Sequence, residues 1–209
     1  MATGQFITLE GGEGTGKSTL VSGLKRSLET RNISVIATRE PGGTPLAELA
    51  RELVLYPRQG EAWSSLSQAL MMNAARDDHL RKSIRPALQD GQWVLCDRFS
   101  DSTRVYQALE GTDPAILRQL ETAVVADTIP NLTFMLDGDP EKFAQRRAGR
   151  GTEDVFERKG LDFHRAVRKA FLDIAAEEPG RCVVLDAEMP AEDVLTAALA
   201  IIETRFGLT

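Results

Sequence analysis

Cysteine and histidine are scarce in this chain, with two residues of each among 209. Cys96 and Cys182 lie far apart, and their spacing matches neither a disulfide framework nor a zinc site. Both lie in apolar, strand-like runs, which predicts buried thiols in a protein of the reducing cytosol. His79 and His164 stand alone in segments of helical periodicity. We interpret both histidines as surface or packing residues without a catalytic role.

Long apolar runs and an excess of basic residues are also missing. No apolar run approaches the ~18 residues that a membrane-spanning helix requires, and the N-terminus leads into a strand-like run rather than a signal peptide. The formal net charge of −6 disfavours a general nucleic-acid-binding protein, which would carry a basic face. Two basic clusters, at 81–85 and 146–150, remain candidates for local phosphate contacts. We therefore expect a cytoplasmic protein that binds neither membranes nor nucleic acid.

Strand-like runs alternate with helical segments along the chain. A length of 209 residues with 42% hydrophobic residues suits one domain, which we place over 1–209. The alternation predicts an α/β fold in which helices cover both faces of a five-stranded parallel sheet. The segment 64–91 is predicted to form one long helix that ends at Gly91. The five predicted strands lie at 5–10, 33–38, 92–97, 131–137 and 181–186.

The first predicted strand leads into the glycine-rich stretch LEGGEGTGKSTL at 9–20. Gly11, Gly16, Lys17 and Ser18 fit the pattern G-x-x-x-x-G-K-[ST] of the phosphate-binding loop (P-loop). Glycines allow successive N–H groups to point inward, and the helix that begins near Lys17 adds its positive end. A turn without chemical importance is the alternative, but a strand before it and a helix after it favour nucleoside triphosphate binding. The predicted ATP-binding residues of this loop are Gly11, Gly12, Glu13, Gly14, Thr15, Gly16, Lys17, Ser18 and Thr19.

Two of these residues have assigned chemistry. Lys17 is predicted to sit on a solvated loop and to reach the β- and γ-phosphates, and the Ser18 hydroxyl is predicted to bind Mg²⁺. Asp97, at the end of the third predicted strand, resembles the second acidic element that helps to hold this ion. Arg98 follows it, and its planar guanidinium can bind two phosphate oxygens at once.

Two further segments follow the ends of predicted strands, where ligands bind in an open parallel sheet. The stretch TREPGGTPLAELAREL at 38–53 forms a stiff turn and a helix that carries Arg51, which is either a solvated surface residue or a ligand contact. The stretch RRAGRGTEDVFERKGLDF at 146–163 mixes arginines, glycines and acids. A solvated charge run is the ordinary interpretation of such a segment. A mobile lid over about 146–158 is the functional one, because closure excludes water during phosphoryl transfer.

These segments together resemble the thymidylate kinase family, of the bacterial type. FITLEGGEGTGKST resembles its phosphate loop, TREPGGTPLAELAREL its second-strand motif, and CDRFSDSTRVYQ its Asp-Arg-aromatic signature with a Thr-x-x-Tyr-Gln tail. The resemblance covers nearly the whole chain. It implies a P-loop, nucleoside monophosphate kinase-like fold and transfer of the γ-phosphoryl group of ATP to dTMP, giving dTDP, with Mg²⁺. It also implies a homodimer.

The resemblance assigns roles by matched position. It implies that Arg51, Arg76 and Arg98 hold the phosphate and thymine edge of dTMP, and that Glu13 approaches its 3′-hydroxyl. Tyr106 would pack on the deoxyribose and disfavour a 2′-hydroxyl. The implied catalytic residues are Lys17, Arg98, Arg150, Asp97 and Glu13. The implied substrate-binding residues are Glu40, Pro41, Arg51, Leu53, Met72, Arg76, Arg98, Thr103, Tyr106, Gln107 and Phe156, with Thr103 and Gln107 reading the base.

Three positions distinguish this chain within the family pattern. One subtype carries a catalytic arginine in the phosphate loop, but Gly14 occupies that position here. The lid would then supply the arginine, with Arg150 as the best match and Arg146, assigned to the ATP side, as the second. Met72 stands where relatives place a phenylalanine over the thymine, and Val155 stands where the lid often has an arginine.

Three alternatives to a dTMP kinase remain open from the residues alone. Another nucleoside monophosphate, such as dUMP, CMP or GMP, could be the acceptor. A GTP-dependent switch would normally carry an Asn-Lys-x-Asp segment, which the sequence does not contain. A ligase or partitioning ATPase on the same fold would lack the Thr-x-x-Tyr-Gln tail. Release of ADP with and without each monophosphate would distinguish these classes.

Overall fold

The chain folds around one sheet of five parallel strands in the order β2-β3-β1-β4-β5. The computed structural model describes residues 4–58, 61–147 and 154–208. All five predicted strands are confirmed, and each begins within two residues of its predicted position. The strands are β1 (Phe6–Gly11), β2 (Val35–Arg39), β3 (Trp93–Asp97), β4 (Leu132–Asp137) and β5 (Cys182–Asp186).

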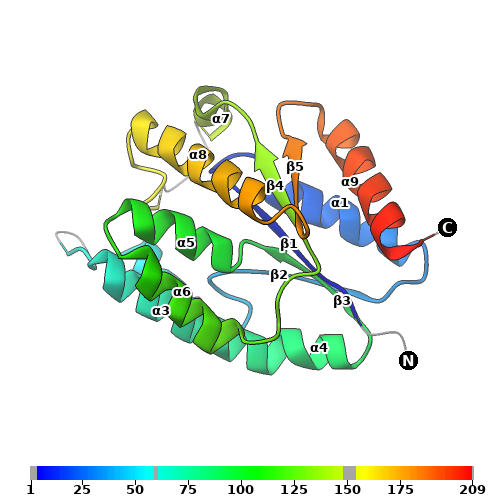
Figure 1. Ribbon diagram of the computed structural model, residues 1–209, viewed down its shortest axis with the longest axis horizontal. Coiled ribbons are helices and arrows are strands. Elements are labelled where there is room, and N and C mark those ends of the chain that lie inside the picture. Colours follow the sequence, from blue (N-terminus) through cyan, green and yellow to red (C-terminus); the bar gives the residue numbers. More distant parts are fainter. Residues whose placement is uncertain (1–3, 59–60, 148–153, 209) are drawn as a thin grey trace.

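Helices cover both faces of this sheet (Figure 1). On one face, α1 (Lys17–Glu29) and α9 (Ala191–Phe206) pack on alternate residues of the central strands, such as Ile7, Leu9 and Phe134. The opposite face is covered by α5 (Ser100–Leu109) and α8 (Leu161–Glu177) and by the helical segments that precede β3. The remaining helices are α2 (Pro45–Leu55), α3 (Ser65–His79), α4 (Arg85–Gln89), α6 (Pro114–Val125) and α7 (Pro140–Arg147).

The segment predicted as one long helix is interrupted by a π-helical turn. α3 runs to His79, the π-helical turn covers Leu80–Ile84, and α4 continues to Gln89. Pro86 explains the interruption, because it has no N–H to donate and its ring would clash with the carbonyl group four residues earlier in a regular helix. Gly91, with φ at 77°, lies just beyond the helix as predicted.

Both cysteine thiols are free and buried, as predicted. Burial raises the pKa of the Cys182 thiol to about 12. Within the described residues, no helix has both the length and the apolar character needed to cross a membrane.

Candidate active site

The phosphate loop connects the carboxyl end of β1 to the N-terminus of α1. Gly11, Gly14 and Gly16 have φ values of 133°, 78° and 90°, which side chains other than glycine rarely adopt. Gly11 is also pressed against the sheet, because an added Cβ atom would lie 2.4 Å from the carbonyl oxygen of Leu136. The loop therefore wraps around the end of α1 and presents its backbone N–H groups there, which is an anion-binding geometry.

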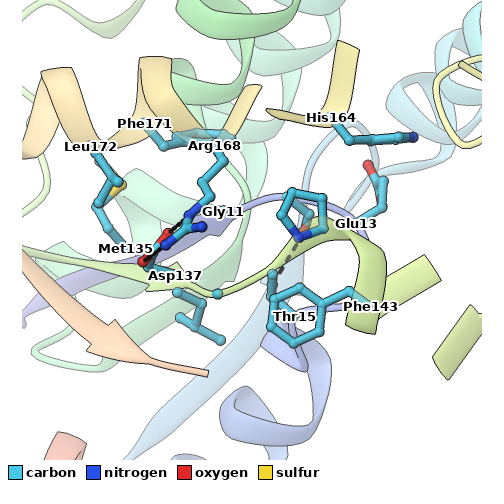
Figure 2. A pocket seen from close by; sticks show the side chains of 14 residues that line it. Gly11, Glu13, Thr15, Met135, Asp137, Phe143, His164, Arg168, Phe171 and Leu172 are labelled. Atoms are coloured by element: carbon cyan, nitrogen blue, oxygen red, sulfur yellow. Dashed lines mark hydrogen bonds and ion pairs between the residues drawn. The ribbon is translucent and has the colours of Figure 1, made fainter. Parts of the chain in front are cut away.

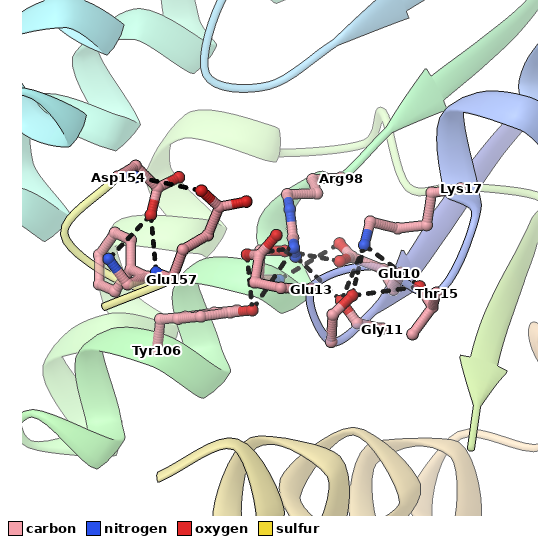
Figure 3. Close-up of polar contacts among 12 residues, drawn as sticks. Glu10, Gly11, Glu13, Thr15, Lys17, Arg98, Tyr106, Asp154 and Glu157 are labelled. Atoms are coloured by element: carbon pink, nitrogen blue, oxygen red, sulfur yellow. Dashed lines mark hydrogen bonds and ion pairs between the residues drawn. The ribbon is translucent and has the colours of Figure 1, made fainter. Parts of the chain in front are cut away.

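Lys17 folds back over this loop, as Figure 3 shows. Its ammonium group donates hydrogen bonds to the carbonyl oxygens of Gly11 at 3.1 Å and Gly12 at 2.7 Å, and the residue is 7% exposed. The prediction that Lys17 lies on a solvated loop is therefore wrong, because these carbonyl groups replace water around the ammonium. Burial and the nearby Arg98 lower the pKa of Lys17 to about 8.

Ser18 and Asp97 provide the oxygen atoms that a magnesium ion requires. The Ser18 hydroxyl donates to Asp97 Oδ2 at 2.5 Å, beside the phosphate loop. Asp97 pairs in register with Leu9 of β1, which brings the ends of these neighbouring strands together. The described residues contain no group of three or more histidine, cysteine or acidic side chains arranged to hold a metal ion. Mg²⁺ commonly uses only one or two protein groups together with phosphates and water, so the Ser18–Asp97 pair fits this ion.

Arg98 occupies a strained backbone conformation, with φ at 68°. Its guanidinium donates to the Gly11 carbonyl oxygen at 3.0 Å, the Ser102 hydroxyl at 3.1 Å and Glu13 Oε1 at 2.6 Å. A positive φ turns the chain sharply at the end of β3, and the side chain reaches across to β1. The site thus holds this arginine between the phosphate loop and the start of α5.

Glu13 is bound by two neighbours in this cluster (Figure 3). It accepts from Arg98 and also from the Tyr106 hydroxyl at 3.1 Å. Burial alone would raise the pKa of Glu13, but the positive charges of Arg98 and Lys17 outweigh it and lower the pKa to about 2. Glu13 is therefore an anion across the physiological pH range.

A cavity of about 320 Å³ lies beside this cluster. It includes most of the side chains that the sequence assigned to the acceptor, and they come from segments far apart in the chain. The lining residues that were predicted are Glu13, Glu40, Pro41, Arg51, Met72, Arg76, Arg98, Thr103, Tyr106, Gln107 and Phe156. Those that sequence reasoning missed are Leu55, Tyr56, Phe99, Ser102, Asp154 and Glu157.

Leu53 does not line this cavity, which corrects its assignment as a substrate-binding residue. Its side chain is 55% exposed, whereas Leu55 is 5% exposed and faces the cavity. Two residues along a helix differ in direction by about 200°, so these leucines point to opposite sides of α2.

A second cavity, of about 250 Å³, lies over the phosphate loop. It is lined by Gly14, Lys17, Ser18 and Asp97, among others. Four residues line both cavities, namely Glu13, Glu40, Arg51 and Arg98. The two cavities therefore meet at a junction where guanidinium groups face the phosphate loop.

Arg51 reaches this junction from α2. Its guanidinium donates to the carbonyl oxygen of Pro41 at 3.0 Å. Burial and repulsion from Arg39 lower the pKa of Arg51. An anion placed at the junction would relieve both effects, so the electrostatics favour a phosphate there.

The far end of the larger cavity carries neutral and paired polar groups. The Gln107 amide nitrogen donates to Gln68 Oε1 at 3.1 Å. Thr103 accepts a hydrogen bond from Arg76 at 3.1 Å, and both residues are buried. Such fixed polar groups suit recognition of a base edge.

A third cavity, of about 420 Å³, lies on the other side of the phosphate loop. Thr15, Gly16 and Thr19 contribute the loop side, and residues 187–191, which follow β5, form the opposite wall. Sequence reasoning missed this wall, because its Ala-Glu-Met-Pro-Ala sequence contains no charged or glycine-rich pattern that indicates a ligand.

Side chains of α8, such as His164 and Arg168, lie beside the phosphate loop (Figure 2). Arg168 donates two hydrogen bonds to the Asp137 carboxylate, at 2.7 and 2.9 Å, and so fixes α8 to the end of β4. His164 lies in the same region and is buried, as is His79 in α3. The sequence predicts surface or packing residues at both positions. Their burial shows that the packing interpretation is correct for both.

The lid is only partly described. Arg150 lies outside the described residues, and Arg146 lies in α7, although the structure does not describe its side chain. In the described end of the lid, Asp154 accepts hydrogen bonds from the backbone N–H groups of Phe156 and Glu157. This capped turn holds the Phe156 ring 5.0 Å from the ring of Tyr106.

The basic cluster at 81–85 lies outside the three cavities. Arg81 and Lys82 pair with Asp78, and Arg85 donates to the Thr128 hydroxyl and the Val124 carbonyl oxygen. These contacts within the protein replace the phosphate contacts that the sequence left open.

Comparison with known proteins gives one answer. A family model described as thymidylate kinase matches residues 9–198. The thymidylate kinase of Caulobacter vibrioides is 46% identical over 209 residues, which is 100% of both chains, and that of Magnetococcus marinus is 46% identical over 205 residues, 97% of each chain. The crystal structure of thymidylate kinase from Ehrlichia chaffeensis matches with a TM-score of 0.78 at 34% identity, over 96% of this chain and 99% of that one. Since the match extends over the sheet, the phosphate loop and the residues of both cavities, the chain belongs to the thymidylate kinase family.

Proposed function

We propose that the cavity over the phosphate loop holds the ATP phosphates, that the cavity of about 320 Å³ (the acceptor cavity) holds dTMP, and that the phosphoryl group passes between them at Arg51 and Arg98. The reaction itself follows from the family: the chain is a nucleoside monophosphate kinase that phosphorylates dTMP to dTDP with ATP. The observation that carries the placement is that two polar cavities share Glu13, Glu40, Arg51 and Arg98.

The protein's task in this reaction is to align two anions and to neutralise their charge. Lys17 binds the β- and γ-phosphates from the loop side, and Arg98 binds the transferred group from the opposite side. Mg²⁺ held by Ser18 and Asp97 would neutralise charge on the ATP phosphates. Because the acceptor is already an anionic phosphate, no strong general base is needed, and Glu13 serves to orient Arg98 and approach the 3′-hydroxyl.

The acceptor residues divide by their place in the cavity. Arg51 and Arg98 lie at the junction and hold the dTMP phosphate. Arg76, Thr103 and Gln107 lie at the far end and read the thymine edge. Tyr106 packs on the deoxyribose between them. Pro41, Met72 and Phe156 complete the apolar walls.

Closure of the lid brings an arginine to the transferred phosphoryl group and completes the neutralisation of its negative charge. Gly14 leaves the phosphate loop without an arginine, and the segment 146–158 carries the arginines that the resemblance assigns to this role. Arg150 supplies the catalytic guanidinium, with Arg146 in a secondary role on the ATP side. Arg150→Ala should lower kcat far more than it raises KM for dTMP, because the interaction forms mainly as charge develops.

A homodimer is supported by an exposed apolar surface on α2 and α3. Leu46, Leu49, Leu53, Leu66 and Leu70 on these helices are each at least 41% exposed. The two helices pack side by side, so the exposed leucines lie on neighbouring elements. Apolar surfaces of this kind commonly mark subunit interfaces. Sedimentation of L49D and L70D variants, which should be monomeric if this surface is the interface, tests the assignment.

The placement of the chain as one domain over 1–209 and in the cytoplasm also remains a proposal. All five strands share one sheet, which supports one domain. Both buried thiols are reduced, which supports a cytoplasmic protein.

Release of ADP tests the proposed function. Purified protein is incubated with ATP and Mg²⁺, alone and with dTMP, dUMP, CMP or GMP. We expect fast release only with dTMP and weaker release with dUMP. Equal release without any monophosphate would contradict the acceptor assignment and indicate a nucleoside triphosphatase. Repeating the assay with EDTA tests the requirement for Mg²⁺.

A further inference from the structure

His79 is buried in α3, and both of its ring nitrogens are engaged. The residue is 0% exposed. Nδ1 lies 3.1 Å from Glu40 Oε1, and Nε2 lies 2.8 Å from the hydroxyl of Thr38. A carboxylate only accepts hydrogen bonds, so Nδ1 carries the proton and donates to Glu40. The Thr38 hydroxyl can then donate to the bare Nε2.

Glu40 uses its other oxygen to hold Arg76. The Arg76 Nε atom donates to Glu40 Oε2 at 2.7 Å, and the two residues are 3% and 4% exposed. Since the pair is buried, its geometry depends on every remaining lone pair and proton being satisfied. The hydrogen bond from His79 satisfies the oxygen of Glu40 that Arg76 leaves unused.

The protein also fixes the other end of Arg76. Its Nη2 atom donates to the Phe99 carbonyl oxygen and the Thr103 hydroxyl, both at 3.1 Å, and its Nη1 atom donates to Asn73 Oδ1 at 3.2 Å. A guanidinium has five N–H groups. Among the described residues, these contacts leave one N–H group of Nη1 without a protein acceptor. Arg76 can therefore offer the acceptor cavity a single donor, which suits a neutral carbonyl oxygen better than a phosphate that binds two donors.

The turn after β2 is shaped around the histidine. A Cβ atom added to Gly43 would lie 2.3 Å from His79 Nε2, so this position has room only for glycine. The same turn has a second connection to α3, because the Thr44 hydroxyl donates to Asp78 Oδ2 at 2.6 Å. The Thr44–Asp78 contact involves neither Glu40 nor Arg76, which provides a matched control for the His79 contact.

We propose that His79 is a positioning residue for base selection. Its Nδ1–H group fixes the Glu40 carboxylate, and Glu40 in turn holds the Arg76 guanidinium. Arg76 then presents one donor to the 4-carbonyl edge of the pyrimidine. This inference rests on the proposed placement of the base beside Arg76. Without the hydrogen bond from His79, the buried Glu40 oxygen must find another partner. The carboxylate would rotate to do so, and the Arg76 guanidinium would lose its fixed orientation.

The test compares dTMP with 5-methyl-dCMP, which carries a 4-amino group in place of the 4-carbonyl. The amide nitrogen of asparagine occupies about the place of Nδ1, whereas that of glutamine occupies about the place of Nε2. His79→Asn should therefore keep the hydrogen bond to Glu40, and His79→Gln should lose it. The measured quantities are kcat and KM for each acceptor and the melting temperature of each variant.

We expect His79→Gln to raise KM for dTMP by about tenfold with little change in kcat, and to lower the ratio of kcat/KM for dTMP over 5-methyl-dCMP by about tenfold. His79→Asn should keep a ratio close to that of the wild type. Asp78→Ala removes the control contact and should change the melting temperature without changing the ratio. Equal ratios in His79→Gln and the wild type would overturn the inference, as would a reduced ratio in Asp78→Ala.

Arg76→Met separates this inference from the proposed function. If Arg76→Met lowers the ratio but His79→Gln does not, the base lies beside Arg76 and the role of His79 is wrong. If Arg76→Met leaves the ratio unchanged, the proposed placement of the base is wrong, and the inference fails with it. If His79→Gln does not fold, Glu40→Gln provides the test, because Glu40 is the residue that connects His79 to Arg76. A ratio of kcat/KM for dTMP over 5-methyl-dCMP equal to that of the wild type in Glu40→Gln overturns the inference.

Discussion

The donor and acceptor ends of the site are built in different ways. The proposed donor end is built mainly from one continuous stretch, Gly11 to Thr19, whose backbone N–H groups and one lysine would surround the phosphates. The acceptor cavity collects side chains from α2, α3 and α5, from the turn after β2 and from the described end of the lid. Backbone groups bind any nucleoside triphosphate, whereas the collected side chains can distinguish one acceptor from another. Loss of activity should therefore follow changes at the donor end, and loss of selectivity should follow changes at the acceptor end.

Lys17→Ala should give the largest effect. Removal of one charged contact to a transition state lowers kcat by roughly 10²–10³-fold. Since the Lys17 ammonium also binds the carbonyl oxygens of Gly11 and Gly12, the variant should bind ATP more weakly as well. Rates of ADP release and the affinity for ATP measure both effects. Near-normal activity in the folded variant would contradict the role of Lys17, and a similar loss in Thr19→Ala, which lines the same cavity, would point to the loop backbone instead.

The lowered pKa of Lys17 also predicts a pH dependence. With a pKa of about 8 in the free enzyme, kcat/KM should fall as the pH rises through 8, because the ammonium loses its proton. Bound phosphates favour the charged form, so the corresponding fall in kcat should lie at higher pH. The folded-state pKa lies below the ordinary value of 10.5, so the free energy of unfolding should rise with pH between about 8 and 10.5. If kcat/KM of Lys17→Met falls at the same alkaline pH as that of the wild type, the fall arises from another titrating group.

Arg51→Ala should give the next largest effect, on the acceptor side. Loss of a hydrogen bond to a charged group costs about 1.5–3 kcal/mol, so KM for dTMP should rise roughly 10- to 100-fold. Arg39→Ala is the matched control, since Arg39 lines the donor cavity but not the acceptor cavity. An equal rise in KM for dTMP in both variants would show that Arg51 does not bind the phosphate of dTMP.

Tyr106→Ala should change selectivity more than rate. Its ring leaves no room for a 2′-hydroxyl if it packs on the sugar, so the variant should lose roughly tenfold in the preference for dTMP over its ribose analogue. Tyr106→Phe keeps the ring but loses the hydroxyl that donates to Glu13, so it should keep the preference and lose some kcat. An unchanged preference in Tyr106→Ala would place the discrimination elsewhere.

Met72→Phe should have the smallest effect, and in the favourable direction. Met72 lines the acceptor cavity and is partly buried against the core. A flat ring adds about 0.5–1.5 kcal/mol of stacking beyond burial, so dTMP should bind up to roughly tenfold more tightly. Titration calorimetry and a thermal melt on the same variant decide the outcome. A lower melting temperature without tighter binding would mean that the ring overpacks the core, at about 1–3 kcal/mol.

The two ends of the site also differ in how far the sequence predicts them. The phosphate loop is contiguous, so its spacing alone identified its residues, and the apolar runs located every strand. The acceptor residues were assigned by resemblance, because nothing in their spacing shows that they meet. The resemblance assigned Leu53 to the substrate, and only the folded structure shows that Leu55, on the other side of α2, lines the cavity. The burial of Lys17 was missed because carbonyl groups, which no side-chain pattern shows, surround it.

The hydrogen bonds of His79 illustrate the same limit. Its partners, Glu40 and Thr38, precede it by many residues, and their approach depends on how α3 packs against the turn after β2. Helical periodicity could show only that position 79 lies on a helix. The polar neighbours that make it more than a packing residue appear only when the chain is folded.

The glycines of the phosphate loop differ in the space available for a side chain and in their φ values. These two properties determine which substitutions each position of the loop can accept. At Gly11, an added Cβ atom would meet the Leu136 carbonyl oxygen in the middle of the sheet, and the φ value also disfavours any side chain. At Gly16 there is open space, and only the backbone conformation opposes a side chain. At Gly12 there is open space and no positive φ. In a saturation library selected for growth, position 11 should return glycine alone, position 16 glycine with rare asparagine, and position 12 a broad set of residues.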